Sequence, residues 1–424
     1  MKLNYKNTFI IGLGFFTVSL VWSIYNLAVP LYLDELGLSG TQVGIVMTID
    51  NIFALLFLPL FGTLSDRTWT RYGRRMPYLL VGIPLSAIAF FVLPFTIGSL
   101  TFLMTAVIFL NLFMSIYRAP TVALMPDVTP RPLRSKANGI INFMGGLGSS
   151  ASFFLSSILF KMGEYVPYAV VAGIMFITII LMYNLVKEPE VLEYEKDKNR
   201  ANVDSAQSED RGAKVADNTV KEQERGKLLS LIFILLAIFF WYTGFNAIEA
   251  FFSTYGQVIL GVDKSISSVY LTVFSAVFLL FCIPAGLIAG KFGRKKTILS
   301  GLIVIIVAFI AMIFIRDAIP IYFAMTFGGI GWALININSY PMVVEMTSNA
   351  GIGKYTGYYY FFSMLAAIIS PILYGFIKDM LGDGLMFIYS TIAMVIAFFF
   401  MMLVKHGEIP PVKKSAFEVL ENMD

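Results

Sequence analysis

Hydrophobic residues occur in twelve long runs, and short polar segments separate most of them. A helix that crosses a bilayer needs about 20 consecutive, mostly apolar residues. The runs lie at 8–33, 41–63, 77–97, 100–124, 137–160, 166–187, 228–259, 266–290, 297–315, 320–345, 355–378 and 385–405. This pattern predicts an all-α membrane protein with twelve transmembrane helices.

A polar stretch at 188–227 divides the runs into two sets of six. It is rich in Glu, Lys, Asp, Asn, Gln and Ser, which is typical of a solvated linker. The tail at 406–424 has a similar composition. We therefore expect an N-terminal six-helix bundle at 1–187, a cytoplasmic linker at 188–227, a C-terminal six-helix bundle at 228–405 and a cytoplasmic tail at 406–424.

Composition and charge agree with a membrane location. The 424 residues are 58% hydrophobic and 14% charged, whereas soluble domains average about 25% charged. Of the 31 Lys and Arg residues, 26 lie at the termini or in the even-numbered connections, and this bias predicts cytoplasmic termini. We expect a multi-pass monomer in the plasma membrane, with the lipid bilayer as its partner and no nucleic acid.

The residue types in the sequence give little support for an enzyme. The chain has one cysteine, Cys282, and one histidine, His406, and the sequence contains no cluster with metal-ligand spacing. A membrane-embedded enzyme would need paired acids with histidine or a metal site. We therefore expect no enzyme, no cofactor and no metal. A sugar sensor with a transporter-like fold is an alternative, but such a protein usually has longer cytoplasmic extensions.

A basic turn occurs twice. Gly62–Pro77, GTLSDRTWTRYGRRMP, separates the second and third runs, and a related turn, GLIAGKFGRKK, occupies Gly286–Lys296. The two glycines are about 220 residues apart, which is a repeat of half-chain period. Such a repeat suggests a duplicated transporter. In the second turn Gly290 stands where the first has Asp66.

The first turn resembles the signature loop of the major facilitator superfamily between its second and third spans. The resemblance rests on Gly62, Asp66, Arg67, Thr70, Arg71, Gly73, Arg74, Arg75 and Pro77. Its R-x-G-R-R-x-P-Y element is similar to that of sugar–cation symporters, both the sucrose transporters and the glycoside–pentoside–hexuronide family. The segment YRAPTVALMPD, which holds Arg118 and Asp127, resembles the fourth span of sucrose transporters.

This resemblance implies two pseudo-symmetric six-helix bundles and symport of a disaccharide or other glycoside by alternating access. Melibiose-type permeases carry acids in the inner half of span 2, whereas Ala54–Leu60 here contains none. The difference favours protons over sodium as the coupling ion. A sodium-coupled sugar symporter and a transporter of another solute, such as a drug efflux pump, remain alternatives. The asparagines of spans 5, 7 and 10 favour sugar.

Three charged residues lie inside predicted spans: Asp50, Arg118 and Glu249. Intramembrane charges are costly and usually functional. Burial favours the protonated form of a carboxylate, and a nearby arginine favours the charged form. We therefore expect Asp50 or Glu249 to carry the proton, with Arg118 as a switchable counter-charge or a donor to substrate hydroxyls. A static ion pair that fixes helix packing is the alternative.

A sugar site needs aromatic faces and neutral hydrogen-bonding groups. The candidate substrate-binding residues are Tyr25, Asn26, Asn142, Trp241, Tyr242, Asn246, Asn336, Asn338, Tyr340 and Tyr359. Asparagines within spans also join helices to one another, and aromatic residues also pack or lie at the membrane interface.

The resemblance implies that Asp66 and its arginines tie span 2 to span 11 when the transporter is open to the outside. The candidate cytoplasmic gate comprises Gly62, Asp66, Arg67, Arg71, Gly73, Arg74, Arg75, Asp127, Arg131, Arg134 and Glu345. Asp127 with Arg131 and Arg134 would form a second contact, and Glu345 its counterpart in the second half. Arginines held inside by charge bias alone are the alternative.

Overall fold

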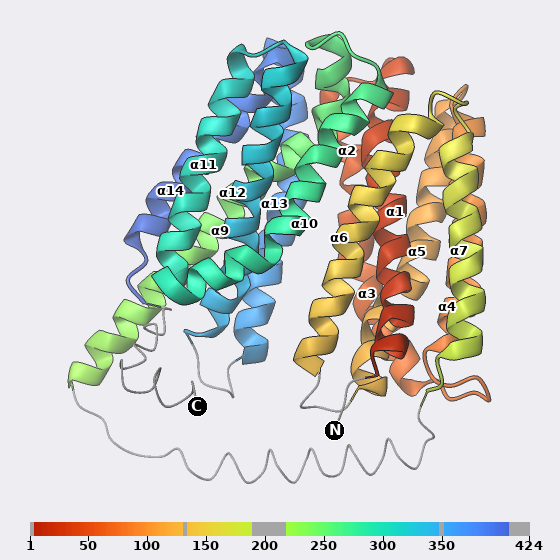
Figure 1. The fold of residues 1–424 in the computed structure, drawn as a ribbon, viewed down its shortest axis with the longest axis horizontal. Coiled ribbons are helices and arrows are strands. Elements are labelled where there is room, and N and C mark those ends of the chain that lie inside the picture. Colours follow the sequence, from red (N-terminus) through yellow and green to blue (C-terminus); the bar gives the residue numbers. More distant parts are fainter. Residues whose placement is uncertain (1–3, 130–133, 189–217, 347–351, 407–424) are drawn as a thin grey trace, which may run out of the picture. The chain divides into compact units, whose positions relative to one another are not determined.

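The computed structural model describes residues 4–129, 134–188, 218–346 and 352–406, and within these ranges the regular elements are helices (Figure 1). They are α1 (Tyr5–Glu35), α2 (Gly40–Met47), α3 (Ile49–Arg67), α4 (Met76–Val92), η1 (Leu93–Thr96), α5 (Leu100–Val128), α6 (Arg134–Leu159), α7 (Val166–Leu185), α9 (Asn218–Val258), α10 (Lys264–Phe292), α11 (Arg294–Phe314), α12 (Ala318–Val344), α13 (Ile352–Leu381), η4 (Asp383–Leu385) and α14 (Met386–Leu403).

The helices follow the predicted hydrophobic runs, which confirms the all-α membrane fold. In the described part of the chain, eleven helical segments are long and apolar enough to cross a membrane, with α2 and α3 counted as one. The twelfth run is α6, whose many glycines and serines lower its hydropathy. Those small residues bring α6 close to α1. The Ser152 hydroxyl donates to the Leu20 carbonyl at 2.9 Å, and a Cβ on Gly148 would lie 2.5 Å from the Phe16 carbonyl oxygen.

The chain forms two compact units. Unit 1 comprises Met1–Ala216, Phe245–Leu279 and Ala367–Met386, and unit 2 comprises Asp217–Gly244, Leu280–Ala366 and Phe387–Asp424. Helices α9, α10 and α13 thus contribute residues to both units. The predicted domain boundaries at 187 and 228 stay predictions, because most of the linker lies outside the described residues, as does the tail beyond 406.

Helix packing within each unit is tight at the interior faces. In unit 1, α1 packs against α5, α6 and α7, α4 packs against α5 and α7, and α3 packs against α5. In unit 2, α11 packs against α12, and their backbones approach closely where Gly301 faces Gly331. Large apolar side chains such as Phe102, Leu280 and Phe314 remain exposed, as expected of helix faces that contact lipid.

The second predicted span is interrupted at Thr48, although no proline or glycine stands there. The Thr48 hydroxyl donates to the Ile45 carbonyl at 2.8 Å, and the Thr48 backbone N–H bonds to the same carbonyl at 3.2 Å. This tight turn ends α2, and a new helix, α3, begins at Ile49. The interruption therefore places Asp50 in the first turn of a helix rather than in the middle of one.

Candidate functional site

The intramembrane charges predicted from the sequence meet inside unit 1. Asp50 lies in the first turn of α3, where the helix dipole favours negative charge, and it accepts a hydrogen bond from Asn51 Nδ2 at 2.8 Å. Arg118 on α5 interacts electrostatically with Asp50, and both side chains are half-buried. Tyr25 on α1 is fully buried and also lies within the field of Asp50.

Glu249 extends this cluster from a fourth helix. It lies on α9, about 13 Å before the end of that helix at a rise of 1.5 Å per residue. Asn26 Nδ2 on α1 donates to Glu249 Oε1 at 3.2 Å, and the charge of Asp50 acts on Glu249. The protein leaves part of the Glu249 side chain uncovered. We call Asn26, Asp50, Arg118 and Glu249 the charged cluster.

A second group of predicted residues meets inside unit 2. Asn336 Nδ2 on α12 donates to the Tyr242 hydroxyl at 3.0 Å, and the Tyr242 and Tyr359 hydroxyls lie 3.1 Å apart. The Tyr340 ring meets the Tyr359 ring edge-on at 5.4 Å. Ser339, which the sequence did not single out, lies 3.2 Å from the Tyr359 hydroxyl. We call Tyr242, Asn336, Tyr340 and Tyr359 the aromatic–amide cluster.

Other candidates have different surroundings. Asn338 is buried and donates to the Ala285 carbonyl of α10 at 3.3 Å and to the Leu334 carbonyl at 2.9 Å, which favours a role in joining helices. Trp241 is fully buried, which favours packing. Asn142 is exposed on α6 and Asn246 is half-buried on α9.

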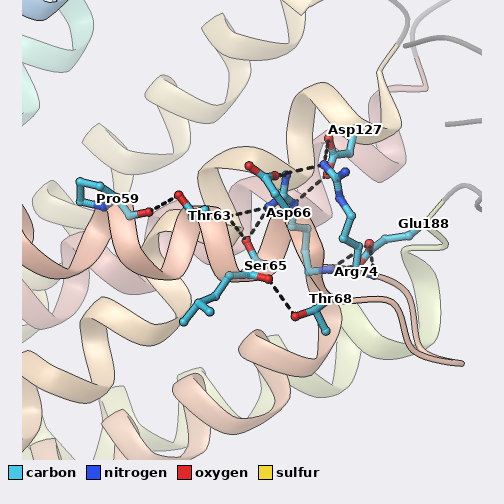
Figure 2. A network of polar contacts seen from close by, with 11 residues as sticks. Pro59, Thr63, Ser65, Asp66, Thr68, Arg74, Asp127 and Glu188 are labelled. Carbon is cyan, nitrogen blue, oxygen red and sulfur yellow. Dashed lines mark hydrogen bonds and ion pairs between the residues drawn. The ribbon is translucent and has the colours of Figure 1, made fainter. Parts of the chain in front are cut away.

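The signature turn forms a closed network of charges at the end of α3, as Figure 2 shows. Arg75 pairs with Asp66 and, through Nε at 2.8 Å, with Asp127 of α5. Arg74 reaches Asp127 at 3.0 Å and Asp66 at 3.4 Å. Both arginine side chains are 4% exposed, whereas Asp66 is 56% exposed. The arrangement ties α3, α4 and α5 together at this end, which we call the Asp66 end.

Asp127 therefore belongs to the same network as Asp66. The sequence had placed it in a separate contact with Arg131 and Arg134, but Arg131 and the side chain of Arg134 lie outside the described residues. Arg71 stacks on Tyr72 with its guanidinium carbon 4.6 Å from the ring centroid. Arg67 is the last residue of α3.

Glu188 completes the network, and the sequence analysis missed it. Its carboxylate accepts the backbone N–H groups of Arg74 at 2.7 Å, Arg75 at 2.9 Å and Met76 at 2.7 Å. These donors form the start of α4, where a helix has unsatisfied N–H groups. Gly73 has φ +105°, and a Cβ there would lie 2.6 Å from the Glu188 carboxyl carbon. The available signal was an acid directly after the sixth predicted span, but it was the first residue of a charged segment assigned to the linker.

The second-half turn makes different contacts. Arg294, the first residue of α11, pairs with Glu345 at the end of α12 at 2.5 Å. This contact corresponds to Arg74 with Asp127 in the first half. Lys295 instead donates to the carbonyls of Met402 at 2.9 Å and Val404 at 2.6 Å, where α14 ends.

The opposite end of unit 1, which we call the Asp34 end, is closed by contacts between segments far apart in the sequence. Lys378 of α13 lies between Asp34 at 3.1 Å and Asp383 at 3.3 Å, and the Thr254 hydroxyl donates to Asp34 at 2.8 Å. A separate pair joins Lys264 of α10 to Glu164, which also accepts from Tyr32.

Helices α2 and α13 touch through their backbones at the Asp34 end. A Cβ on Gly375 would lie 2.0 Å from the Gly40 carbonyl oxygen, and a Cβ on Gly44 would lie 2.2 Å from that of Pro371. Asp379 accepts the backbone N–H groups of Gly40 and Thr41 at the start of α2. We call this contact the α2–α13 seam.

The family follows from comparison with known proteins. A family model described as "Major Facilitator Superfamily" matches residues 11–371 and, in a second match, 259–420. The chain belongs to the Major Facilitator Superfamily. It is accordingly a multi-pass membrane transporter and not an enzyme. The all-helical fold with two sets of apolar helices agrees with this membership.

Proteins whose names state different functions resemble the chain. The tetracycline resistance protein class H of Pasteurella multocida is 21% identical over 83% of this chain and 84% of its own length. The putative glycoside/cation symporter YagG of Escherichia coli is 29% identical over 39% of each chain. The crystal structure of the nucleoside transporter NupG matches with a TM-score of 0.70 and 14% identity, covering 94% of this chain and all of that one. This structural match concerns the fold alone.

Proposed function

We propose that the protein is a secondary active transporter that couples uptake of a neutral disaccharide or other glycoside to a cation, with the proton as the favoured ion. The observation that carries the proposal is the aromatic–amide cluster in unit 2. Its tyrosine hydroxyls and the Asn336 amide supply neutral donors and acceptors, and its rings supply faces for sugar C–H groups. The similarity to a putative glycoside/cation symporter supports the same substrate class.

The cation would act in the charged cluster. Asp50, Arg118 and Glu249 belong to membrane-spanning helices, where ionisable groups usually serve transport. The proposal places the protein in the plasma membrane with both termini in the cytoplasm, as the distribution of Lys and Arg predicts. The Asp66 end would then face the cytoplasm and the Asp34 end the outside.

Transport would proceed by alternating access, because each end of unit 1 carries contacts that can break and re-form. At the Asp34 end, ion pairs and the α2–α13 seam join α1, α2, α10 and α13. At the Asp66 end, the network joins helices of the first half, and Asp66 itself is half-exposed and available to a further partner. Discrete contacts of this kind allow two alternative states.

Efflux of a non-sugar solute is the second candidate. The extent of the sequence matches favours this candidate: the tetracycline resistance protein matches most of the chain, whereas YagG matches 39% of it. A drug exporter is expected to have an apolar cavity with few amides, which is not the character of the aromatic–amide cluster.

Transport in proteoliposomes tests the proposal. Labelled disaccharides, aryl glycosides, nucleosides and tetracycline are offered under an imposed proton gradient, a sodium gradient or neither. We expect one glycoside to accumulate under a proton gradient and not without one. Accumulation of tetracycline alone, or glycoside uptake that neither gradient drives, would overturn it. Tyr242→Phe with Asn336→Ala should raise the KM for the glycoside at least tenfold, whereas Tyr322→Phe, outside the cluster, serves as a control.

The α2–α13 seam gives a test of alternating access. Gly375→Ala should displace α2 and favour states open at the Asp34 end, because a Cβ there meets backbone that has no room to move. Gly357→Ala is the matched control on the same helix, since a Cβ at Gly357 meets no atom within 4 Å. Spin labels at Glu35→Cys and Leu381→Cys, in a Cys282→Ser background, report the separation. Identical distance distributions for the two alanine variants would contradict this mechanism.

A further inference from the structure

The charged cluster contains one negative charge more than it can balance. With all groups ionised, Asp50 and Glu249 contribute two negative charges and Arg118 contributes one positive charge. Among the described residues, the charge that acts on Asp50 is that of Arg118, and the charge that acts on Glu249 is that of Asp50. A net charge inside membrane-spanning helices is costly. One bound monovalent cation, a proton or Na⁺, would make the cluster neutral.

Burial disfavours the charge of Asp50, and three neighbouring features act against this effect and favour the ionised form. Arg118 supplies the opposite charge, Asn51 Nδ2 donates a hydrogen bond at 2.8 Å, and the first turn of α3 adds a favourable helix dipole. The turn at Thr48 creates this helix start, so the break in the second span places Asp50 where the helix dipole favours its negative charge.

The surroundings of Glu249 lack these features. It lies within α9 rather than at a helix start, it is repelled by Asp50, and it accepts a hydrogen bond from the neutral amide of Asn26 at 3.2 Å. Among the described residues, the titratable groups that interact with Glu249 or with Asp50 are Asp50 itself on α3, Arg118 on α5 and Tyr25 on α1. Other side chains also leave Glu249 partly uncovered, which leaves room beside its carboxylate for a cation.

The hydrogen bond between Asn26 and Glu249 offers a way for substrate binding to affect cation binding. Its amide supports the ionised form of Glu249 as long as it donates to Oε1. If a substrate hydroxyl takes this amide, Glu249 loses its donor and holds a cation more tightly. By thermodynamic reciprocity, a cation on Glu249 releases Asn26 and strengthens substrate binding by the same factor. The sign of this coupling is that of symport.

We propose that Glu249 carries the coupling cation, that Asp50 remains the fixed counter-ion of Arg118, and that Asn26 links cation binding to substrate binding. This inference rests on the proposed function, since it assigns roles within that transport cycle. Asn26 is a positioning residue here, because it acts through Glu249. For a proton, the step is the protonation of the Glu249 carboxylate to a neutral carboxyl group, with the proton taken from water on one side and released on the other.

Paired transport assays in proteoliposomes separate the two acids, using the glycoside that the substrate panel identifies. Glu249→Gln should lose gradient-driven accumulation while still exchanging internal for external substrate, because exchange needs no release of the cation. Glu249→Asp should recover part of the accumulation. Asp50→Asn should impair both processes, and Asp50→Asn with Arg118→Gln should recover part of both.

The control is Asp263→Asn, which removes an acid at the start of α10 that accepts a hydrogen bond from the backbone N–H of Ile266. Loss of accumulation with intact exchange in Asp50→Asn, but not in Glu249→Gln, would overturn the assignment.

Infrared difference spectroscopy tests the same assignment with no substrate. The purified protein is compared at two pH values and with and without Na⁺. We expect a protonated-carboxyl C=O band, or its Na⁺-induced shift, that is absent in Glu249→Gln and kept in Asp50→Asn. The proton and sodium arms identify the ion. The reverse pattern, or a band present in both variants, would refute the role of Glu249 even if glycoside transport is confirmed. A band that behaves as expected while glycosides fail to accumulate would sustain it and refute the sugar instead.

Asn26→Ala tests the link. It should reduce the effect of a saturating cation on the KM for substrate by at least fivefold while leaving the carboxyl band of Glu249 in place. A purely structural role would change substrate affinity equally with and without the cation, and that result would remove Asn26 from the coupling.

Discussion

The two basic turns of this chain each contain a glycine with positive φ, and they differ in their charges. Gly73 and Gly293 precede α4 and α11 with φ of +105° and +92°, a conformation that favours glycine. In each half the arginine after this glycine pairs with an acid at the end of the next helix but one: Arg74 with Asp127 of α5, and Arg294 with Glu345 at the end of α12. The first half adds Asp66, and the second half has Gly290 in its place.

The missing acid changes what the second cation does. Arg75 binds Asp66 and Asp127, whereas Lys295 turns to the carbonyls at the end of α14. The helix ends that are capped also differ. Glu188 accepts hydrogen bonds from backbone N–H groups at the start of α4, whereas Lys295 donates to backbone carbonyls at the end of α14. Both turns therefore keep the glycine and the arginine–acid pair, but each half satisfies its helix ends with a different charge. The first network is also more deeply buried than the Arg294–Glu345 pair.

Removal of Arg75 should have the largest effect. Arg75→Gln leaves Asp127 with less compensation in a buried site and should lower the free energy of unfolding in detergent by about 3–5 kcal/mol. Arg294→Gln breaks a pair whose arginine is 30% exposed and should lose at most about 1 kcal/mol. Equal losses would show that burial does not distinguish the two halves. Arg71→Gln, on the exposed part of the turn, is the control.

The two helix-capping residues, Glu188 and Lys295, should show the next largest difference in their effect on stability. Glu188→Ala leaves three backbone N–H groups at the start of α4 without their acceptor and should lose about 1–3 kcal/mol of unfolding free energy. Lys295→Ala exposes carbonyls of α14 to water and should lose about 0.3–1 kcal/mol. Glu188→Gln keeps an acceptor oxygen and should retain more stability than the alanine variant. A larger loss for Lys295→Ala would reverse the comparison.

Asp66→Asn should affect transport more than stability. Because this acid is 56% exposed, and because Arg75 keeps Asp127, the loss of unfolding free energy should be about 1 kcal/mol. If Asp66 serves the gate, the turnover number should fall by at least tenfold at unchanged substrate KM. Transport kinetics alongside thermal unfolding decide this, and normal turnover would leave the acid with a structural role only.

Installing the missing acid should have the smallest effect. A Cβ at Gly290 meets no atom within 4 Å, so Gly290→Asp is sterically tolerated. A new exposed pair with Lys295 or Arg294 should add about 0.2–0.5 kcal/mol. A double-mutant cycle with Lys295→Ala measures the pair directly. A coupling energy of zero would mean that Lys295 does not leave α14 for an acid.

Much of the fold was predictable, because a bilayer imposes long apolar helices that are visible in the hydrophobic pattern alone. The three ionisable residues of the charged cluster were also visible in the sequence, since ionisable groups stand out in apolar spans. Thr48 was not, because its helix break depends on a hydroxyl–carbonyl bond that many threonines could make. Glu188 was hidden for a related reason: an acid in a charged segment gains meaning only when the start of α4 lies beside it.

The sequence by itself determined the helices, the superfamily signature and the short inventory of intramembrane charges, because these follow from local chemistry and spacing. Tertiary structure decided which of those residues meet. It joined Asp127 to Asp66, brought Asn26 to Glu249 across 223 positions, and separated Asn338, which joins helices, from Asn336, which faces tyrosines. The physical reason is that hydrogen bonds and ion pairs act over a few ångströms, so their partners are set by helix packing and not by distance along the chain.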